Sequence, residues 1–295
     1  MENIVNTLKN SHNLVLTGAP GTGKTYLAKK IAEAMNAETE FVQFHPSYDY
    51  TDFVEGLRPT KPDSGPDIGF VRTDGVFKSF CNKAIDSSST FVFIIDEINR
   101  GELSKIFGEL FFAIDPSYRG EKGMVKTQYQ NLVEKDDLYS NGFYVPENVY
   151  IIGTMNDIDR SVESMDFAMR RRFTWIEVKA EDRIEMWDDP DDGIAEWKDE
   201  AHKRMTALNA AIEKVEGLSS AYDIGPAYFL KLKQCNGDFN QLWEYHLEGL
   251  LKEYLRGMPD AEKKLGALHN AYNQKDEGKQ GGPTQLEQPV EAEGK

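Results

Sequence analysis

The sequence predicts an α/β protein with a parallel-sheet core and a C-terminal helical domain, and three observations support this fold class. Over roughly the first 180 of its 295 residues, short β-branched or aromatic runs alternate with helical patterns, as in βαβ units. A glycine-rich turn follows the first run and opens a helix. After residue 180 only helical patterns remain. We therefore expect an α/β core over residues 1–180, a helical lid domain over 181–272 and a disordered tail over 273–295.

Five apolar or β-branched runs are predicted to form the strands of the sheet. They are Asn13–Thr17, Glu40–Phe44, Phe91–Ile95, Val149–Gly153 and Phe173–Val178. The third run is the most apolar, as expected of a central parallel strand that is buried on both faces. The helix that follows the glycine-rich turn is predicted over roughly Lys24–Met35.

Two stretches between the strands do not resemble simple helical crossovers. Arg58–Gly75 is rich in proline and glycine, and we expect it to be an exposed excursion. Pro116–Pro146 is too long for a loop without secondary structure of its own, so we expect it to carry a hairpin.

The predicted helical domain begins with a strongly acidic stretch. Glu181–Glu200 contains ten acidic and two basic residues, a net charge of −8. We interpret this stretch as a solvated linker with a helix start, and a partner-docking patch is the alternative. Helical patterns follow over Trp197–Val215, Phe239–Arg256 and Asp260–Tyr272. The segment beyond Tyr272 is too polar to bury a core, which predicts the disordered tail.

Composition excludes several classes of protein. The chain has 34 Lys and Arg against 50 Asp and Glu, a net charge of −16, which disfavours tight, sequence-blind binding of nucleic acid by this chain alone. Two cysteines are too few for a disulfide framework. The N-terminus has no signal-peptide pattern, and no apolar run approaches the length of a membrane span. We expect a cytoplasmic protein that does not act in the membrane.

The glycine-rich turn matches the phosphate-binding pattern G-x-x-x-x-G-K-[ST]. Its glycines allow backbone N–H groups to surround phosphate oxygens at a helix N-terminus. Lys24 would reach the β- and γ-phosphates, and the Thr25 hydroxyl would bind Mg²⁺. The residues expected to bind nucleotide in this loop are Gly18, Ala19, Pro20, Gly21, Thr22, Gly23, Lys24 and Thr25.

Two carboxylates end the most apolar strand. Phe91–Ile95 runs directly into Asp96 and Glu97. Asp96 is placed to bind Mg²⁺, directly or through water, and Glu97 to act as the general base that polarises the attacking water. The alternative for Glu97 is a solvated charge at the end of a strand.

A third polar element follows the next strand, in the segment Gly153-Thr-Met-Asn156-Asp-Ile-Asp159-Arg160. Asn156 is the natural candidate to contact the γ-phosphate or its water, because a neutral amide orients a water without competing for its proton. Further on lies the triplet Arg170-Arg171-Arg172. Capping of a helix C-terminus explains one of these arginines but not three, so we interpret the triplet as containing an arginine finger that reaches a neighbouring subunit.

Together these segments resemble the McrB-type AAA+ P-loop NTPases, the motor subunits of modification-dependent restriction systems. The resemblance covers about Asn3 to Arg256. It rests on GAPGTGKT, FHPSYDYTDFVEGLRP, IIDEINRGELSKIFGEL, GTMNDIDRSVESMDFAMRRRF and YDIGPAYFL. The pattern M-N-x-x-D-R, which begins at Met155, is its most specific part.

The resemblance implies roles for particular residues and an assembly. The implied site residues are Lys24 and Thr25 in the phosphate loop, Asp96 and Glu97 as the Walker B pair, Asn156 as the sensor, Asp159 and Arg160 in the signature loop, Arg171 or Arg172 as the finger in trans, and Arg100 near the subunit interface. The family implies a homo-oligomeric, hexameric ring that engages an McrC-type nuclease subunit. It also implies that DNA is read through a separate N-terminal domain.

The sequence departs from the family pattern in two respects. Met1 lies only about a dozen residues before the first predicted strand, so we expect either a motor without its DNA-reading domain or one that works with DNA-binding subunits encoded elsewhere. The segment Asp223–Leu230 lacks the arginine that many AAA+ proteins use as a second sensor. McrB-type proteins resemble this chain there, so the difference does not argue against hydrolysis.

The predicted reaction is Mg²⁺-dependent hydrolysis of GTP or ATP. The McrB-type resemblance implies GTP and the wider AAA+ class implies ATP, with GTP slightly favoured. The guanine-reading pattern N-K-x-D of small GTPases is absent, because Ile85 stands where the aspartate belongs. Two other functions stay open: a nucleotide-gated assembly switch with little turnover, and a P-loop small-molecule kinase.

Overall fold

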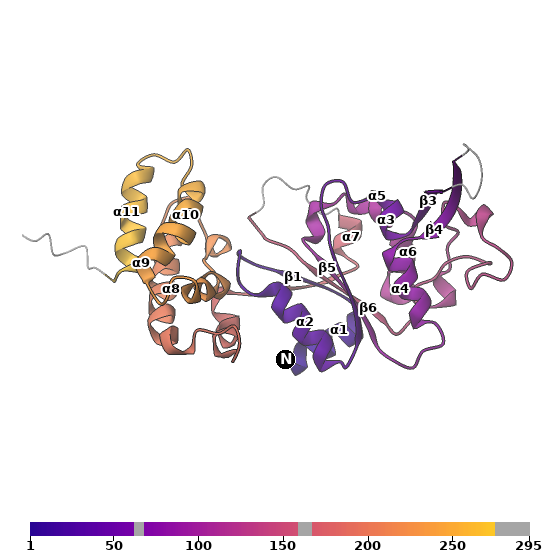
Figure 1. The fold of residues 1–295 in the computed structure, drawn as a ribbon, viewed down its shortest axis with the longest axis horizontal. Helices are drawn as coiled ribbons and strands as arrows, with labels where there is room; N and C mark the ends of the chain where they lie inside the picture. Colours follow the sequence, from indigo (N-terminus) through magenta and orange to yellow (C-terminus); the bar gives the residue numbers. More distant parts are fainter. Residues whose placement is uncertain (62–67, 159–166, 275–295) are drawn as a thin grey trace, which may run out of the picture.

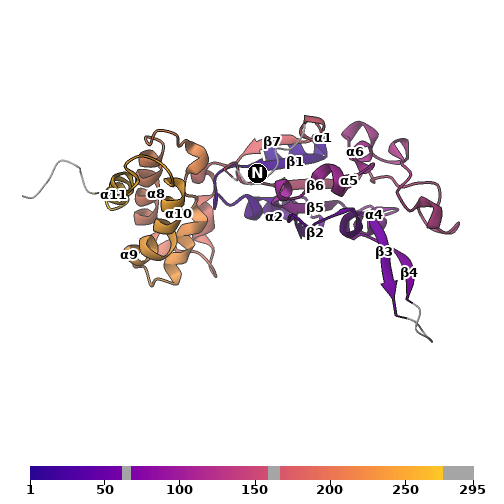
Figure 2. The ribbon, with the colours of Figure 1, turned by 90° about the horizontal axis from the view of Figure 1, so that it is seen from above.

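The chain contains an α/β core and a bundle of helices beside it, as Figures 1 and 2 show. The structure is a computed structural model and describes residues 1–61, 68–158 and 167–274. The core sheet has five parallel strands in the order β2-β5-β6-β1-β7. These strands are β1 (Asn13–Thr17), β2 (Glu38–Gln43), β5 (Phe91–Asp96), β6 (Val149–Thr154) and β7 (Thr174–Glu177). The predicted α/β class with a parallel sheet is confirmed, and each predicted strand overlaps an observed one.

Strand alternation builds a layer of helices on each face of the sheet. In β1, Leu14 and Leu16 belong to one apolar cluster, whereas Val15 between them belongs to another. The first cluster includes side chains of α1 (Glu2–Ser11) and α2 (Lys24–Ala34). The second includes side chains of α3 (Tyr50–Phe53), α4 (Val76–Ala84), α5 (Leu103–Phe107) and α6 (Leu110–Ala113). Among these helices, the sequence predicted only α2.

The parallel register brings the carboxyl ends of three strands to one edge of the sheet. Ile95 of β5 pairs with Gly153 of β6, and Leu16 of β1 pairs with Thr154. The residues that follow each strand therefore meet there, which is where open α/β sheets bind their ligands.

The hairpin of this protein lies in the first excursion, not in the second. β3 (Glu55–Thr60) and β4 (Gly69–Asp74) form a two-stranded antiparallel sheet that projects from the core in Figure 2. The prediction of a hairpin in Pro116–Pro146 was wrong. That segment contains short 3₁₀ turns and a single bridge between Val125 and Phe143.

Side-chain hydrogen bonds explain how Pro116–Pro146 keeps its shape without a strand pair. Arg119 is buried and donates to Asn13 Oδ1 (2.5 Å) and to the Val149 carbonyl (3.3 Å). Burial lowers the pKa of Arg119 to about 10. In the hairpin, proline and glycine conceal the strand pattern. Pro59 has no backbone N–H, so it is tolerated only where the strand needs no hydrogen-bond donor at that position.

The C-terminal helices pack around a separate apolar core. They are α8 (Lys198–Ile212), α9 (Phe239–Leu242), α10 (Glu248–Tyr254) and α11 (Ala261–Tyr272). Their shared core extends from Met186 to Tyr272 and includes the buried indole of Trp187. The single helix predicted over Phe239–Arg256 is interrupted by a π-helical turn at Trp243–Leu247. The segment Ala180–Asp188, near the predicted start of the lid domain, is a 3₁₀ stretch.

The predicted tail over 273–295 lies almost entirely outside the described residues, so it stays a prediction. Within the part of the chain that the structure describes, no helix combines the length and apolar character needed to cross a membrane.

Candidate active site

A cavity of about 450 Å³ lies where the strand ends of the core face the helical bundle. Its lining residues come from the phosphate loop and α2, from the ends of β5 and β6, and from the helical part. They are Pro20, Gly21, Gly23, Lys24, Thr25, Tyr26, Asp96, Glu97, Thr154, Asn156, Met186, Asp189, Asp192, Ala227 and Leu230. The structure thus brings the central predicted site residues into one cavity.

The phosphate loop is packed tightly against the helical part. Gly23, at a φ of 87°, caps α2, and a Cβ there would lie 2.5 Å from Met186 Cε. The Pro20 and Gly21 carbonyls accept hydrogen bonds from the Gly225 (3.2 Å) and Ala227 (3.0 Å) backbone N–H groups. Glycine is therefore required at position 23 for two reasons. The backbone there has a positive φ, and Met186 of the helical part comes too close for a Cβ.

Lys24 is buried at the start of α2, with its amine turned back onto the loop. Its Nζ donates to the Gly18 carbonyl (3.0 Å) and the Ala19 carbonyl (2.7 Å). Burial lowers the pKa of Lys24 to about 8, although Asp157, Glu97 and Asp96 oppose this shift. An anionic phosphate beside the amine would raise this pKa again, because a nearby negative charge stabilises the charged form.

The lowered pKa of Lys24 predicts that nucleotide binding takes up a proton in alkaline solution. Near pH 9 the amine is mostly neutral in the free chain, and bound phosphate should return its pKa toward 10.5. Titration calorimetry of the Mg²⁺-nucleotide in buffers of different ionisation enthalpy should then show uptake approaching one proton near pH 9. Uptake near pH 7 should be small, since Lys24 is already charged there. Equal proton uptake at both pH values would contradict this prediction. Lys24→Ala should abolish the binding of the nucleotide itself.

Asp96 is held by two hydroxyl groups from neighbouring elements. Thr25 Oγ1 donates to Asp96 Oδ1 at 2.7 Å, and Thr154 Oγ1 donates to the same oxygen at 2.6 Å. The Thr25 hydroxyl and the Asp96 carboxylate are hard oxygen ligands, and Mg²⁺ is commonly bound by one or two such groups together with substrate phosphates. This pair therefore fits the expected Mg²⁺. No cluster of three or more His, Cys, Asp or Glu side chains suited to a metal occurs among the described residues.

Glu97 turns away from the strand into a left-handed backbone conformation. Its φ is 52°, which costs a non-glycine residue about 1–2 kcal/mol. This turn lets Glu97 Oε1 accept a hydrogen bond from Asn156 Nδ2 at 2.8 Å. Arg100 Nε lies 3.2 Å from Glu97 Oε2, so Arg100, expected near a subunit interface, contacts the carboxylate of its own chain.

The three arginines at the end of α7 (Phe167–Arg170) and just beyond it differ in their surroundings. The Arg170 guanidinium lies over the Trp175 ring, 4.4 Å from its centroid. Arg172 is 10% exposed, donates to the Ala168 carbonyl (2.5 Å) and lies 3.8 Å from Asp115. Arg171 is exposed, and within the described ranges its side chain contacts no partner. Of the two candidate fingers, the geometry therefore favours Arg171.

Asp159 and Arg160 lie outside the described residues, so their predicted role stays a prediction.

Sequence reasoning missed Thr154, although a hydroxyl at the end of a core strand was a usable signal. It also missed Asp157, whose pKa is raised by burial and partly lowered again by Lys24. Asp189 and Asp192 belong to the acidic stretch interpreted as a linker, and the structure places both at the cavity.

Two family models match parts of the chain that line this cavity. A family model of the AAA domain (dynein-related subfamily) matches residues 13–173, more than half of the chain. A model of the α-helical lid domain of McrB matches residues 200–263.

Curated relatives match part of their own length. The chain is 43% identical over 185 residues to the type IV methyl-directed restriction enzyme EcoKMcrB subunit of Escherichia coli (strain K12), covering 61% of this chain and 38% of that protein. It is 28% identical over 206 residues to the type II restriction enzyme BsuMI component YdiS of Bacillus subtilis (strain 168), covering 59% of this chain and 60% of that protein. The chain thus spans less than two thirds of each relative. A crystal structure from Cytophaga hutchinsonii, described as an ATPase, aligns with this chain at a TM-score of 0.39 and 15% sequence identity. The alignment covers 93% of this chain and 76% of that one.

Proposed function

The chain belongs to the McrB-type AAA+ nucleoside triphosphatases, and on this premise we propose that it hydrolyses GTP or ATP with Mg²⁺ as the motor subunit of a restriction system. The observation that carries the proposal is the shared cavity of Lys24, Asp96, Glu97 and Asn156. A buried cation, a hydroxyl–carboxylate pair and a positioned carboxylate are the groups that phosphoryl transfer to water requires.

Each side chain has a distinct role in the proposed reaction. Lys24 would exchange its contacts with the loop carbonyls for the β- and γ-phosphate oxygens. A bound Mg²⁺ would neutralise charge on these oxygens, with Thr25 and Asp96 as the residues that hold it. Glu97 would accept the proton of the attacking water as the bond between the γ-phosphorus and the bridging oxygen breaks. Asn156, which donates to Glu97, would keep that carboxylate and the water in line.

We propose that the cavity prefers guanine over adenine. With the phosphates on the loop, the base extends toward the helical part, where Met186 and Leu230 offer apolar surface. Asp189 and Asp192 also line the cavity. Backbone N–H groups of Asp192 and Asp191 lower the pKa of Asp189, so its carboxylate is ionised at neutral pH. A carboxylate accepts both N–H groups on the pairing edge of guanine, whereas adenine presents an acceptor there.

Asp189→Asn should therefore reduce the preference for GTP over ATP by about tenfold, the discrimination typical of one bidentate contact to a base. Asparagine keeps an oxygen that accepts from the Asp191 and Asp192 backbone, so the local turn should persist. The measurement is the ratio of kcat/KM for the two nucleotides. Asp191→Asn is the matched control, because Asp191 does not line the cavity. An unchanged ratio in Asp189→Asn would remove this carboxylate from base selection.

We also propose that the active form is a ring of identical subunits that engages an McrC-type nuclease and contacts DNA through other subunits or domains. Support comes from the two relatives, which are a subunit and a component of restriction enzymes. The test is the mass of the assembly with and without non-hydrolysable GTP and ATP analogues, combined with phosphate release. Nucleotide-dependent rings that release phosphate support the motor. Rings without turnover indicate an assembly switch, and a monomer that phosphorylates an acceptor indicates a kinase.

A further inference from the structure

One face of the β3–β4 hairpin is covered at its base and uncovered toward its end. The register pairs Glu55 with Asp74, Leu57 with Arg72, and Pro59 with Phe70, which places these six side chains on one face. Figures 1 and 2 show the hairpin at the end of the core that lies away from the helical bundle. This face is therefore remote from the nucleotide cavity.

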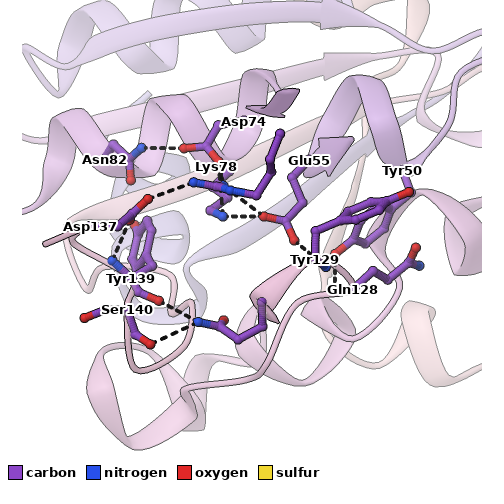
Figure 3. A network of polar contacts seen from close by, with 12 residues as sticks. Tyr50, Glu55, Asp74, Lys78, Asn82, Gln128, Tyr129, Asp137, Tyr139 and Ser140 are labelled. Atoms are coloured by element: carbon purple, nitrogen blue, oxygen red, sulfur yellow. Dashed lines mark hydrogen bonds and ion pairs between the residues drawn. The ribbon is translucent and has the colours of Figure 1, made fainter. Parts of the chain in front are cut away.

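A buried ionic network fixes the base of this face, as Figure 3 shows. The Glu55 carboxylate is fully buried and accepts from Lys78 Nζ (2.5 Å) and Arg72 (3.2 Å). Its other oxygen accepts the Tyr129 backbone N–H at 3.0 Å. Arg72 also donates to Asp137 at 2.8 Å. The contacts of Tyr129 with Glu55 and of Asp137 with Arg72 therefore join the hairpin to the segment 127–140, and Lys78 joins it to α4.

Beyond this network, the same two segments leave apolar side chains exposed around a groove of about 450 Å³. Phe70 is 67% exposed, Leu132 46% and Leu57 40%. The lining of the groove is Leu57, Phe70, Val71, Arg72, Leu132, Glu134, Asp136 and Asp137. Grouped exposed apolar residues with a polar rim mark interaction sites on soluble proteins.

The charges on the rim indicate what kind of partner fits. Arg72 is the one basic lining residue, and its guanidinium is already paired with carboxylates. Glu134 and Asp136 form no ion pair within the described part of the chain. The free charge of the groove is therefore negative, which disfavours nucleic acid and favours a cationic segment.

We propose that this groove binds a segment of a partner protein that inserts an apolar side chain beside Phe70 and places Lys or Arg against Glu134 and Asp136. The proposal does not depend on nucleotide hydrolysis, because the groove shares no residue with the nucleotide cavity.

The first test is a selection of random 12-residue peptides displayed on phage, with the full chain as bait and counter-selection on Phe70→Ser. Phe70 is exposed, so the variant should fold and hydrolyse nucleotide as the wild type does. Enriched peptides should combine apolar residues with Lys or Arg. Enrichment of acidic or purely apolar peptides, or of none that depends on Phe70, would overturn the proposal.

The second test measures Kd for the best selected peptide by fluorescence anisotropy. Phe70→Ser should raise Kd at least tenfold, and Glu134→Gln with Asp136→Asn should raise it about threefold and flatten its dependence on salt. Tyr245→Ser is the matched control, since Tyr245 is 65% exposed in the helical domain, and its Kd should be unchanged. If the free chain instead self-associates through the groove, in a manner that Phe70→Ser abolishes, a second copy is the occupant and the proposal is wrong.

Discussion

Replacing Arg171 by alanine should lower nucleotide hydrolysis by about 10³-fold or more while nucleotide binding stays unchanged, the loss typical of a removed arginine finger. Arg171 is exposed and has no side-chain partner among the described residues, so its guanidinium is available to a neighbouring subunit. It would stabilise the charge that develops on the γ-phosphate in that neighbour's cavity. The measurements are phosphate release and the affinity for a fluorescent nucleotide.

Mixed rings test whether the arginine acts across a subunit interface. An Arg171→Ala chain keeps its own Glu97, and a Glu97→Gln chain keeps its own Arg171. Mixing the two should restore measurable hydrolysis, because some interfaces then pair an intact base with an intact finger. If mixed rings form and no activity returns, Arg171 acts within its own chain or has no catalytic role, and Arg100 becomes the next candidate.

Arg172→Ala provides the matched comparison within the same triplet. Arg172 contacts the Ala168 carbonyl and the face of Phe111, so its loss should mainly lower the melting temperature. A selective loss of hydrolysis in Arg172→Ala, with the melting temperature unchanged, would exchange the roles that we assign to the two arginines.

Replacing Glu97 by glutamine should reduce turnover by about 10²- to 10⁴-fold, the range typical of a general base. Glutamine keeps the shape of the side chain and an oxygen that accepts from Asn156, but it cannot take a proton from water. Binding and nucleotide-dependent assembly should persist, because Lys24, Thr25 and Asp96 are untouched. Phosphate release under single-turnover conditions measures the chemical step.

Glu102→Gln is a suitable control for this substitution. Glu102 lies five residues further on, is exposed and pairs with Lys105 at the surface. Its replacement should leave turnover within about twofold, since surface ion pairs contribute little. Unchanged turnover in Glu97→Gln would mean that another residue activates the water.

The strands and the phosphate loop were predictable because their signals are local. An apolar run, a glycine-rich turn and the start of a helix follow one another between Asn13 and Ala34. Parallel strands place their carboxyl ends at one edge, so chain order alone predicted that Lys24, Asp96 and Asn156 would lie together. Their chemical roles depend on these residue types and stay proposals.

The α/β class and the grouping of the phosphate loop with the strand ends were predictable from the sequence, since backbone conformation and strand polarity depend on near neighbours. Features that join distant segments became apparent in the tertiary structure. Thr154 meets Asp96 across 58 positions, and Glu55 meets Lys78 across 23. The tertiary structure also distinguishes a packed Arg172 from an exposed Arg171 in a triplet whose members look alike in sequence. It places the hairpin in a proline-containing stretch that the sequence predicted only as an excursion. Burial and ion pairing arise from contacts between segments far apart in the chain, and no local pattern specifies them.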